Sequence, residues 1–303
     1  MLHYHGRHCF WVVLLTFFLG ISQPSVSGQK QESRIKVAVL SLGHTTEGRV
    51  AAETIVAGLK AEAGFALVDM DQSRLAASGV GYSGSLNLSL NEARDLGAAL
   101  GCDFFVIGDA QTLRRSPSTG PIYYESYASV FIVSARTGRL ITWQRLSSRA
   151  EHAGPAQQSA LRVLASDETR HKIIAAITRA REVERDERAQ IVDRQTPVIE
   201  AAPDDEKKAE AEGLRLPRPF RRLVPAYPQS AADAEAEATV DVLADIDADG
   251  EVKRVEIARW GGFGLDESTL ETVQRLHFFP AMRDGVAMPI RVLLRYNFRK
   301  PPR

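Results

Sequence analysis

Apolar and polar residues alternate most clearly near the end of the chain. Between Ile290 and Phe298 every second residue is apolar, and this set is Ile290, Val292, Leu294, Tyr296 and Phe298. The residues between them are Arg291, Leu293, Arg295 and Asn297. A period of two with one wholly apolar face predicts a strand with one side on a core.

Two further strands and a helix are predicted just before it. Ala238 to Trp260 reads as two strands around Asp249-Gly250, the strongest short-range hairpin signal. A helix follows, with Asp266 expected at its N-cap and Pro280 expected to end it, and Asp284-Gly285 predicts another turn. The predicted order of the C-terminal part is strand, strand, helix, strand.

Residues 34–182 show a different pattern, in which apolar runs of strand length alternate with amphipathic helices. The first helix is predicted between two strands, which favours a parallel pair with a right-handed crossover, and a later hairpin turns at Thr137-Gly138. A mixed sheet with packed helices is expected. The predicted strands are Ile35–Leu42, Phe65–Asp69, Phe104–Gly108, Tyr123–Ser134 and Leu140–Ser147, and the predicted helices are Glu47–Ala63, Asp71–Ala77, Leu90–Leu100 and Ser166–Val183.

Composition divides the 303 residues into further parts. Residues 1–28 read as a secretory signal with small residues before Gln29, and an uncleaved inner-membrane anchor is the alternative. Residues 183–216 are highly charged and predict a flexible linker before a domain at residues 217–300. Lys+Arg and Asp+Glu balance at 38 each, so nothing indicates a nucleic-acid partner. We expect a periplasmic protein.

The C-terminal part resembles a known family. Val224-Pro-Ala-Tyr-Pro-Gln-Ser-Ala231 is similar to the opening of TonB C-terminal domains, and Ile246-Asp-Ala-Asp-Gly-Glu-Val252 is similar to their hairpin. Phe278-Phe-Pro-Ala281 followed by Asp284-Gly285 is similar to their "F-x-P-A…D-G". Leu276 stands where the family usually has Trp, and Ala238 where it has Gly, and both are packing positions. The resemblance implies a small ββαβ domain over residues 217–300.

This resemblance also implies a role. The last strand of such a domain accepts an extended segment of an outer-membrane transporter as an added strand. The implied contact residues are Tyr227, Pro228, Ile290, Arg291, Val292, Leu293, Leu294, Arg295 and Tyr296. Backbone pairing would give the affinity, Arg291 and Arg295 would tune the choice of partner, and Val292→Pro would remove a ladder N–H. The alternative is an envelope scaffold that self-associates as a homodimer through the same edge.

Residues 34–182 resemble, more weakly, the periplasmic α/β domains of the CsgG and LpoB kind. The stretch that carries this resemblance is Glu92 to Asp103, which leads into an apolar strand ending in Gly108. We take it as a hint about the fold alone, because a fold does not transfer a function.

Three motifs suggest chemistry and have simpler explanations. Asp245 to Glu256 matches the calcium-loop template, but its flanks read as strands, so a turn is expected. Gly79-Val-Gly81-Tyr-Ser-Gly84 matches a dinucleotide fingerprint without the strand that should precede it, so a flexible loop is expected. Cys102, the one cysteine after the predicted signal, reads as a buried thiol. We expect no enzyme, cofactor or metal.

Overall fold

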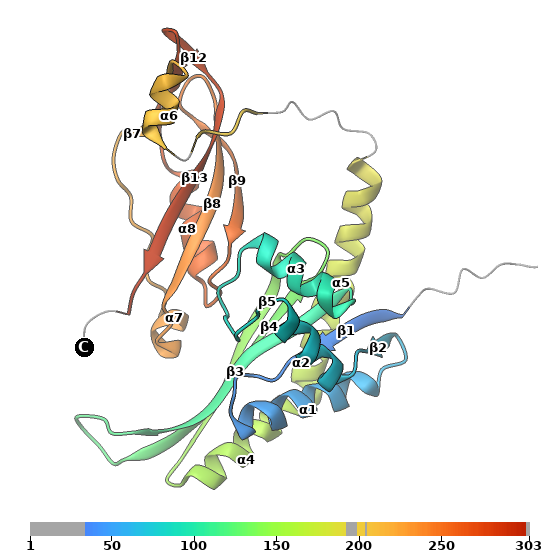
Figure 1. The fold of residues 1–303 in the computed structure, drawn as a ribbon. Helices are drawn as coiled ribbons and strands as arrows, with labels where there is room; N and C mark the ends of the chain where they lie inside the picture. The colour runs from blue at the N-terminus through green and yellow to red at the C-terminus, as the bar shows by residue number, and fades with distance from the viewer. Residues whose placement is uncertain (1–33, 192–198, 204, 301–303) are drawn as a thin grey trace, which may run out of the picture. The chain divides into compact units, whose positions relative to one another are not determined.

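The computed structural model describes residues 34–191, 199–203 and 205–300, and the predicted signal at residues 1–28 lies outside them (Figure 1). It has the mixed α/β fold expected from the sequence, with a small β-rich part at the C-terminal end. In the first part, the strands are β1 (Ile35–Val39), β2 (Phe65–Leu67), β3 (Phe104–Arg115), β4 (Tyr123–Ser134) and β5 (Leu140–Ala150), and the helices are α1 (Thr46–Lys60), α2 (Met70–Gly79), α3 (Leu90–Leu100), α4 (Ala153–Leu164) and α5 (Asp167–Ile191).

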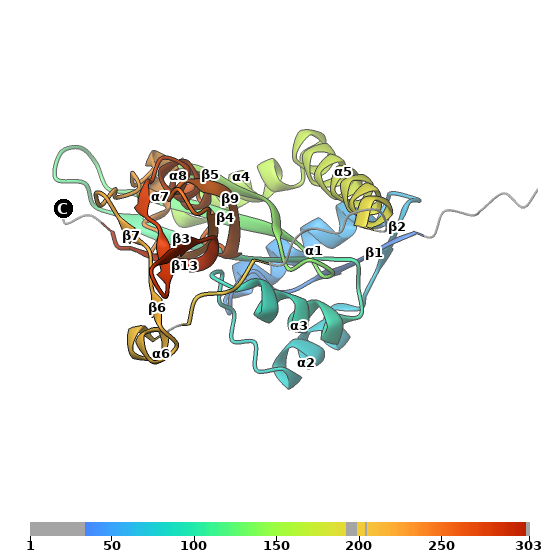
Figure 2. The same cartoon turned by 90° about the horizontal axis from the view of Figure 1, so that it is seen from above.

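These strands form a five-stranded sheet in the order β2-β1-β3-β4-β5, called here the first sheet. Strand β1 is parallel to β2, as the strand-helix-strand pattern predicts, and it is also parallel to β3, whereas β3, β4 and β5 are antiparallel. Because side chains alternate across a strand, Val37 and Phe104 pack with α1, α4 and α5 on one face. Ala38 and Phe105 pack with α2 and α3 on the other face. Figure 2 shows the two groups of helices on opposite sides of the sheet.

Helix α4 is not predicted by the sequence pattern. It buries Ala156, Ala160 and Leu164, which lie four residues apart on one face. Two of these residues are alanine, and Gly154 and Pro155 at the start read as a loop. Helix α5 continues through the charged stretch after Glu182, as the sequence predicts, and ends at Ile191.

The C-terminal part holds strands β6 (Leu214–Arg215), β7 (Arg218–Pro219), β8 (Ala238–Ile246), β9 (Val252–Arg259), β10 (Phe278–Phe279), β11 (Ala281–Arg283), β12 (Val286–Met288) and β13 (Ile290–Phe298), and helices α6 (Glu206–Ala211), α7 (Gln229–Ala234) and α8 (Leu265–Gln274). Strands β13, β8 and β9, in that order, form an antiparallel sheet called here the C-terminal sheet. The predicted hairpin turns at Gly250, whose φ of 86° requires glycine.

Helix α8 starts differently from the prediction. Gly264, with φ 81°, is its N-cap, and Asp266 lies in the first turn. The Asp266 carboxylate instead accepts hydrogen bonds from the backbone N–H groups of Gly261 and Gly262, both at 2.8 Å. The helix ends at Gln274, before Pro280, which lies between β10 and β11. The acid at this position therefore holds the loop before the helix.

The stretch predicted as a linker, residues 183–216, contains regular structure where it is described. It includes the end of α5, helix α6 and strand β6. Ala201 also forms a parallel bridge with Arg291 of β13. The predicted boundaries of the domains stay a prediction, because the described residues from Arg34 onward form one compact unit.

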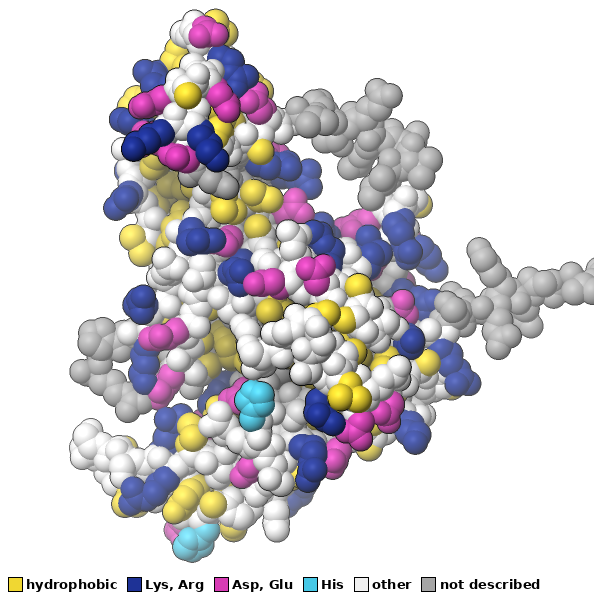
Figure 3. All heavy atoms as spheres, in the orientation of Figure 1, with side chains coloured by type: hydrophobic (Ala, Val, Ile, Leu, Met, Phe, Trp, Pro, Cys, Tyr) yellow, Lys and Arg dark blue, Asp and Glu magenta, His cyan; other side chains and the backbone are white. Residues whose placement is uncertain are grey.

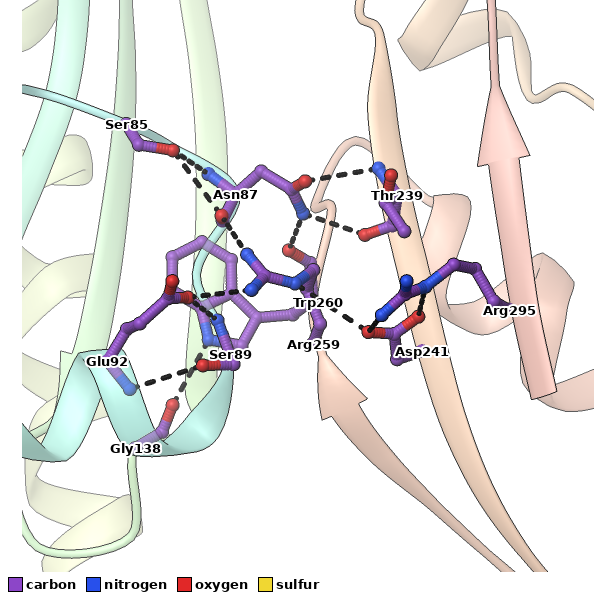
Figure 4. Close-up of polar contacts among 10 residues, drawn as sticks. All are labelled: Ser85, Asn87, Ser89, Glu92, Gly138, Thr239, Asp241, Arg259, Trp260 and Arg295. Carbon is purple, nitrogen blue, oxygen red and sulfur yellow. Dashed lines mark hydrogen bonds and ion pairs between the residues drawn. The ribbon is translucent and has the colours of Figure 1, made fainter. Parts of the chain in front are cut away.

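Trp260, at the end of β9, joins the C-terminal sheet to the first sheet. Its side chain is 1% exposed, and its ring stacks on Phe131 of β4 with the centroids 6.0 Å apart. The indole N–H donates to the carbonyl oxygen of Gly138 at 3.1 Å (Figure 4). A buried Trp whose N–H has an acceptor contributes both buried apolar surface and a directional hydrogen bond to such a junction.

Asn87 closes the same junction from the loop before α3. Its amide donates to the carbonyl oxygens of Thr239 at 2.8 Å and Trp260 at 2.6 Å, and its Oδ1 accepts from the N–H of Thr239 at 3.1 Å (Figure 4). Arg259 donates to the Asn87 carbonyl oxygen and forms an ion pair with Glu92. Polar and apolar contacts together fix the end of β9 on the first sheet.

Candidate docking edge of the C-terminal sheet

Strand β13 is an edge strand. It pairs along its whole length with β8, from Ile290 opposite Ile246 to Phe298 opposite Ala238. Its alternate residues Ile290, Val292 and Phe298 are buried, as the period of two predicts, whereas Leu293 is 46% exposed. An edge strand leaves a row of backbone groups without a ladder partner.

The backbone contacts of Arg291 show which groups of β13 face away from β8. The N–H of Arg291 donates to the Glu200 carbonyl oxygen, and its own carbonyl oxygen accepts from the N–H of Ala202, both at 2.8 Å. Backbone groups alternate in direction along a strand. Those of Leu293, Arg295 and Asn297 therefore face outward with Arg291, and those of Val292 face β8. The prediction that Val292→Pro removes an N–H from the docking ladder is therefore wrong. The N–H of Val292 belongs to the ladder between β13 and β8.

Within the described chain, the outward groups of Leu293, Arg295 and Asn297 have no backbone partner. Strand β9, at the opposite edge, is tied at both ends instead. Glu251 bridges His277 at its start, and Arg259 bridges Ser89 at its end. The β13 edge is thus occupied at Arg291 and open beyond it.

Arg291 and Arg295, which the resemblance implies as partner-selecting residues, are engaged within the sheet. Arg291 donates to both oxygens of Asp245, at 2.5 and 2.8 Å, and Arg295 to both oxygens of Asp241, at 2.7 and 2.9 Å. The two carboxylates are buried, at 4% and 5% exposure. The pKa of each arginine is raised, chiefly by its hydrogen bond to the aspartate. Any role in partner choice stays a prediction.

Tyr227 and Pro228 lie at the far end of β13. The Tyr227 hydroxyl donates to the carbonyl oxygens of Ala236 at 2.7 Å and Ala231 at 3.2 Å, which fixes helix α7. Its ring centroid is 6.4 Å from that of Phe298. Burial raises the pKa of the Tyr227 hydroxyl. Pro228 is the N-cap of α7. Both residues are near the strand, and the contacts that the structure shows are internal.

The calcium-like stretch forms a turn, as expected, and the glycine-rich stretch leads into a loop. Asp247 of the calcium-like stretch accepts from the N–H groups of Asp249 and Glu251, both at 2.9 Å, inside the β8–β9 hairpin. The glycine-rich stretch 79–84 follows helix α2, without a preceding strand. Cys102 is partly buried, less than the fully buried thiol expected, and its burial raises the pKa of the thiol to about 12, which suppresses the reactive thiolate.

The sequence analysis missed a polar hollow of about 530 Å³ between β3, β4, β5 and α7. Four of its charged groups pair with one another. Glu125 accepts from Arg115 at 2.9 Å and from Arg145 at 3.2 Å, and Arg115 also reaches Glu235 at 3.2 Å. These residues come from separate strands and a distant helix, and no spacing along the chain brings them together.

No helix among the described residues is long and apolar enough to cross a membrane. Figure 3 shows acidic and basic side chains intermixed on the visible face, in agreement with the balanced composition.

Known proteins were compared with the chain in three ways. No curated protein matches it. The TonB C-terminal domain of Pseudomonas aeruginosa, solved by NMR, is 22% identical, with 29% of this chain and 89% of that chain covered and a TM-score of 0.25. The LpoB C-terminal domain of Salmonella enterica is 15% identical, with 40% and 84% covered and a TM-score of 0.27. Lipoprotein GNA1162 of Neisseria meningitidis is 11% identical, with 48% and 96% covered and a TM-score of 0.29.

A family model matches the C-terminal part of the chain. Residues 224–299 match the model of the Gram-negative bacterial TonB protein C-terminal, which runs from the loop before α7 to the end of β13. This match supports an envelope protein. Over residues 224–299, the chain is therefore similar to the C-terminal domain of Gram-negative TonB proteins.

Proposed function

We propose that this chain is a periplasmic, non-enzymatic envelope protein that binds an extended segment of an outer-membrane transporter, or of a related envelope partner, by strand addition to β13. One observation carries the proposal. The backbone groups of Leu293, Arg295 and Asn297 face outward on the edge strand of a sheet that matches the TonB C-terminal model. The adjacent position, Arg291, already pairs with an extended segment of the chain.

The edge also has the physical properties that strand addition needs. Its inner side is fixed by nine residue pairs with β8, so an incoming strand finds a rigid template. Each new backbone hydrogen bond contributes a net of about 1 kcal/mol. The exposed Leu293 side chain adds apolar contact. A short strand on this edge would bind weakly to moderately, which suits a contact that must form and break.

Titration of ¹⁵N-labelled protein with peptides from the N-terminal ends of outer-membrane transporters tests the proposal. The amide signals of Leu293, Arg295 and Asn297 are expected to shift together and to become protected from hydrogen exchange. The signals of the β9 edge, for example Arg254, are expected to stay unchanged. A peptide that binds elsewhere and leaves the β13 amides unchanged would contradict strand addition there.

A second copy of the chain is the rival occupant of this edge. Light scattering over a range of concentrations separates the two, since the transporter-binding role predicts a monomer that takes up peptide. A stable dimer that ignores the peptides would favour the scaffold role. N-terminal sequencing of protein from the host decides whether residues 1–28 are removed, and an intact N-terminus would add membrane anchoring and energy-dependent transport to the proposed role.

A further inference from the structure

The segment Ile199–Ala202, called here the edge segment, already lies on β13. Glu200 accepts from the N–H of Arg291, and the N–H of Ala202 donates to the Arg291 carbonyl oxygen, both at 2.8 Å. Ala201 is the residue opposite Arg291, and the pairing is parallel. This is the hydrogen-bond pattern that an added parallel strand makes.

A side-chain clamp holds the edge segment in place. The Glu200 carboxylate accepts from both terminal nitrogens of Arg283, at 2.9 and 2.6 Å. Arg283 ends strand β11, so the clamp ties the segment to a second element beside the edge. The hydrogen bond from Arg283 lowers the pKa of the Glu200 carboxyl. The pairing ends at Ala202, because Pro203 follows and helix α6 begins at Glu206.

The clamp is weak enough to open. Both side chains of the pair are partly exposed, Arg283 at 35% and Glu200 at 42%, and exposed ion pairs are screened by salt. Among the described residues, two backbone hydrogen bonds join the edge segment to β13. Because the segment is tethered, it acts at an effective concentration in the mM range. The edge segment therefore stays on β13 mainly because the chain keeps it close to the strand.

We propose that the edge segment is an internal competitor that covers the start of the β13 edge and must leave before a longer strand can pair with all of it. This inference rests on the proposed docking function of β13. It adds a partner inside the chain, and it makes the stretch before α6 a regulator of the edge.

The test uses a synthetic peptide that copies residues 197–203 and three variants of the protein. Glu200→Lys reverses the charge that faces Arg283, and Ala202→Pro removes the N–H that donates to Arg291. Glu206→Lys, on α6, makes the same change of charge at an exposed residue away from the edge and serves as the control. Glu200 and Glu206 lie outside the buried core, whereas Ala202 packs against it in part, so Glu200→Lys serves as a check on any structural effect of Ala202→Pro.

The first readout is amide hydrogen exchange. In the wild type, the Arg291 amide is expected to exchange at least ~10-fold more slowly than the outward Leu293 amide, because only Arg291 has an acceptor. In Glu200→Lys and Ala202→Pro the two rates are expected to converge, whereas Glu206→Lys keeps the difference. Equal rates in the wild type, or no change in both edge variants, would overturn the proposal.

The second readout is binding of the added peptide up to several mM, followed at the same amides. The edge variants are expected to bind it ~10-fold more tightly than the wild type and the control. Equal affinity for all four proteins, or no binding to any, would show that the segment does not compete for the edge. No transporter peptide enters this experiment, so a failure of the transporter-binding role is seen separately, in the titration described above.

Discussion

Asp245 of β8 lies directly opposite Arg291 of β13, and its two oxygens accept from Nε and Nη2 of that arginine at 2.5 and 2.8 Å. The carboxylate is buried, and the guanidinium, at 32% exposure, shields it from solvent. The same arrangement recurs four residues along, between Asp241 and Arg295. Both pairs fasten the edge strand to its neighbour on the face opposite the core.

Removing either partner of the pair between Arg291 and Asp245 is expected to destabilise the C-terminal sheet. Arg291→Ala leaves the Asp245 carboxylate without its counter-ion and should lower the free energy of unfolding by about 2 kcal/mol, less than for a fully buried pair because Arg291 is partly exposed. Arg291→Ala with Asp245→Ala should recover part of that loss. Urea unfolding of both single variants and the double variant measures the coupling, and strictly additive changes would contradict the pairing.

Trp260→Ala is expected to lower the free energy of unfolding by about 3–5 kcal/mol, the usual loss for a large buried aromatic. The change removes the stacking on Phe131 and the hydrogen bond to Gly138. Trp260→Phe should cost less, since it keeps an aromatic ring against Phe131, although that ring is smaller and lacks the N–H donor. If thermal unfolding shows both variants at wild-type stability, the junction between the two sheets is not held by this residue.

Asn87→Asp should also weaken the junction, by about 1–3 kcal/mol. A carboxylate at this position loses the N–H₂ donor and faces the carbonyl oxygens of Thr239 and Trp260. Asn91→Asp makes the same change at an exposed position in the first turn of α3 and is the control. Limited proteolysis between the two sheets is expected to speed up for Asn87→Asp alone.

The raised pKa of Asp266 predicts that the free energy of unfolding depends on pH. Burial raises the pKa of its carboxyl to about 6, against the lowering effect of the hydrogen bonds from Gly261 and Gly262. The folded state therefore holds a proton that the unfolded state lacks between pH 6 and the ordinary value near 4. Stability contributed by this group should rise as pH falls through that window.

Asp266→Asn should remove this contribution. The difference in free energy of unfolding between wild type and Asp266→Asn is expected to shift in favour of the wild type from pH 7 to pH 4.5. Asp249→Asn, in the exposed turn, is the matched control. A difference that stays constant over the range, measured by urea unfolding at each pH, would contradict the assignment.

The strands of the first sheet and of the C-terminal sheet, and most helices, are readable in the sequence because their signals are local. Asp249-Gly250 turns a hairpin, and the alternation from Ile290 to Phe298 sets the inner and outer faces of β13. Helix α4 is missed because Gly154 and Pro155 at its start are typical of a loop. Asp266 is misplaced as a cap because the glycines that its carboxylate holds lie four and five residues earlier.

The candidate site is only partly readable. The period of two predicts β13, but the alternation of side chains does not tell which backbone groups face the neighbouring strand. The sequence therefore suggests Val292 for the proline substitution, whereas the outward N–H belongs to Leu293. The clamp between Glu200 and Arg283 joins residues 83 positions apart, one of them in a charged stretch that reads as a linker. The contacts of Asn87 with Thr239 and Trp260 span still longer separations.

A single substitution tests the docking edge most directly, with binding of a transporter peptide measured by calorimetry. Leu293→Pro removes one outward N–H at an edge strand, where proline is tolerated, and leaves the ladder with β8 intact. Leu293→Ala shortens the same side chain and keeps the N–H. The account predicts that Leu293→Pro lowers the affinity at least ~10-fold with the fold preserved, while Leu293→Ala changes it by less. Equal affinities for Leu293→Pro and Leu293→Ala would contradict strand addition to β13.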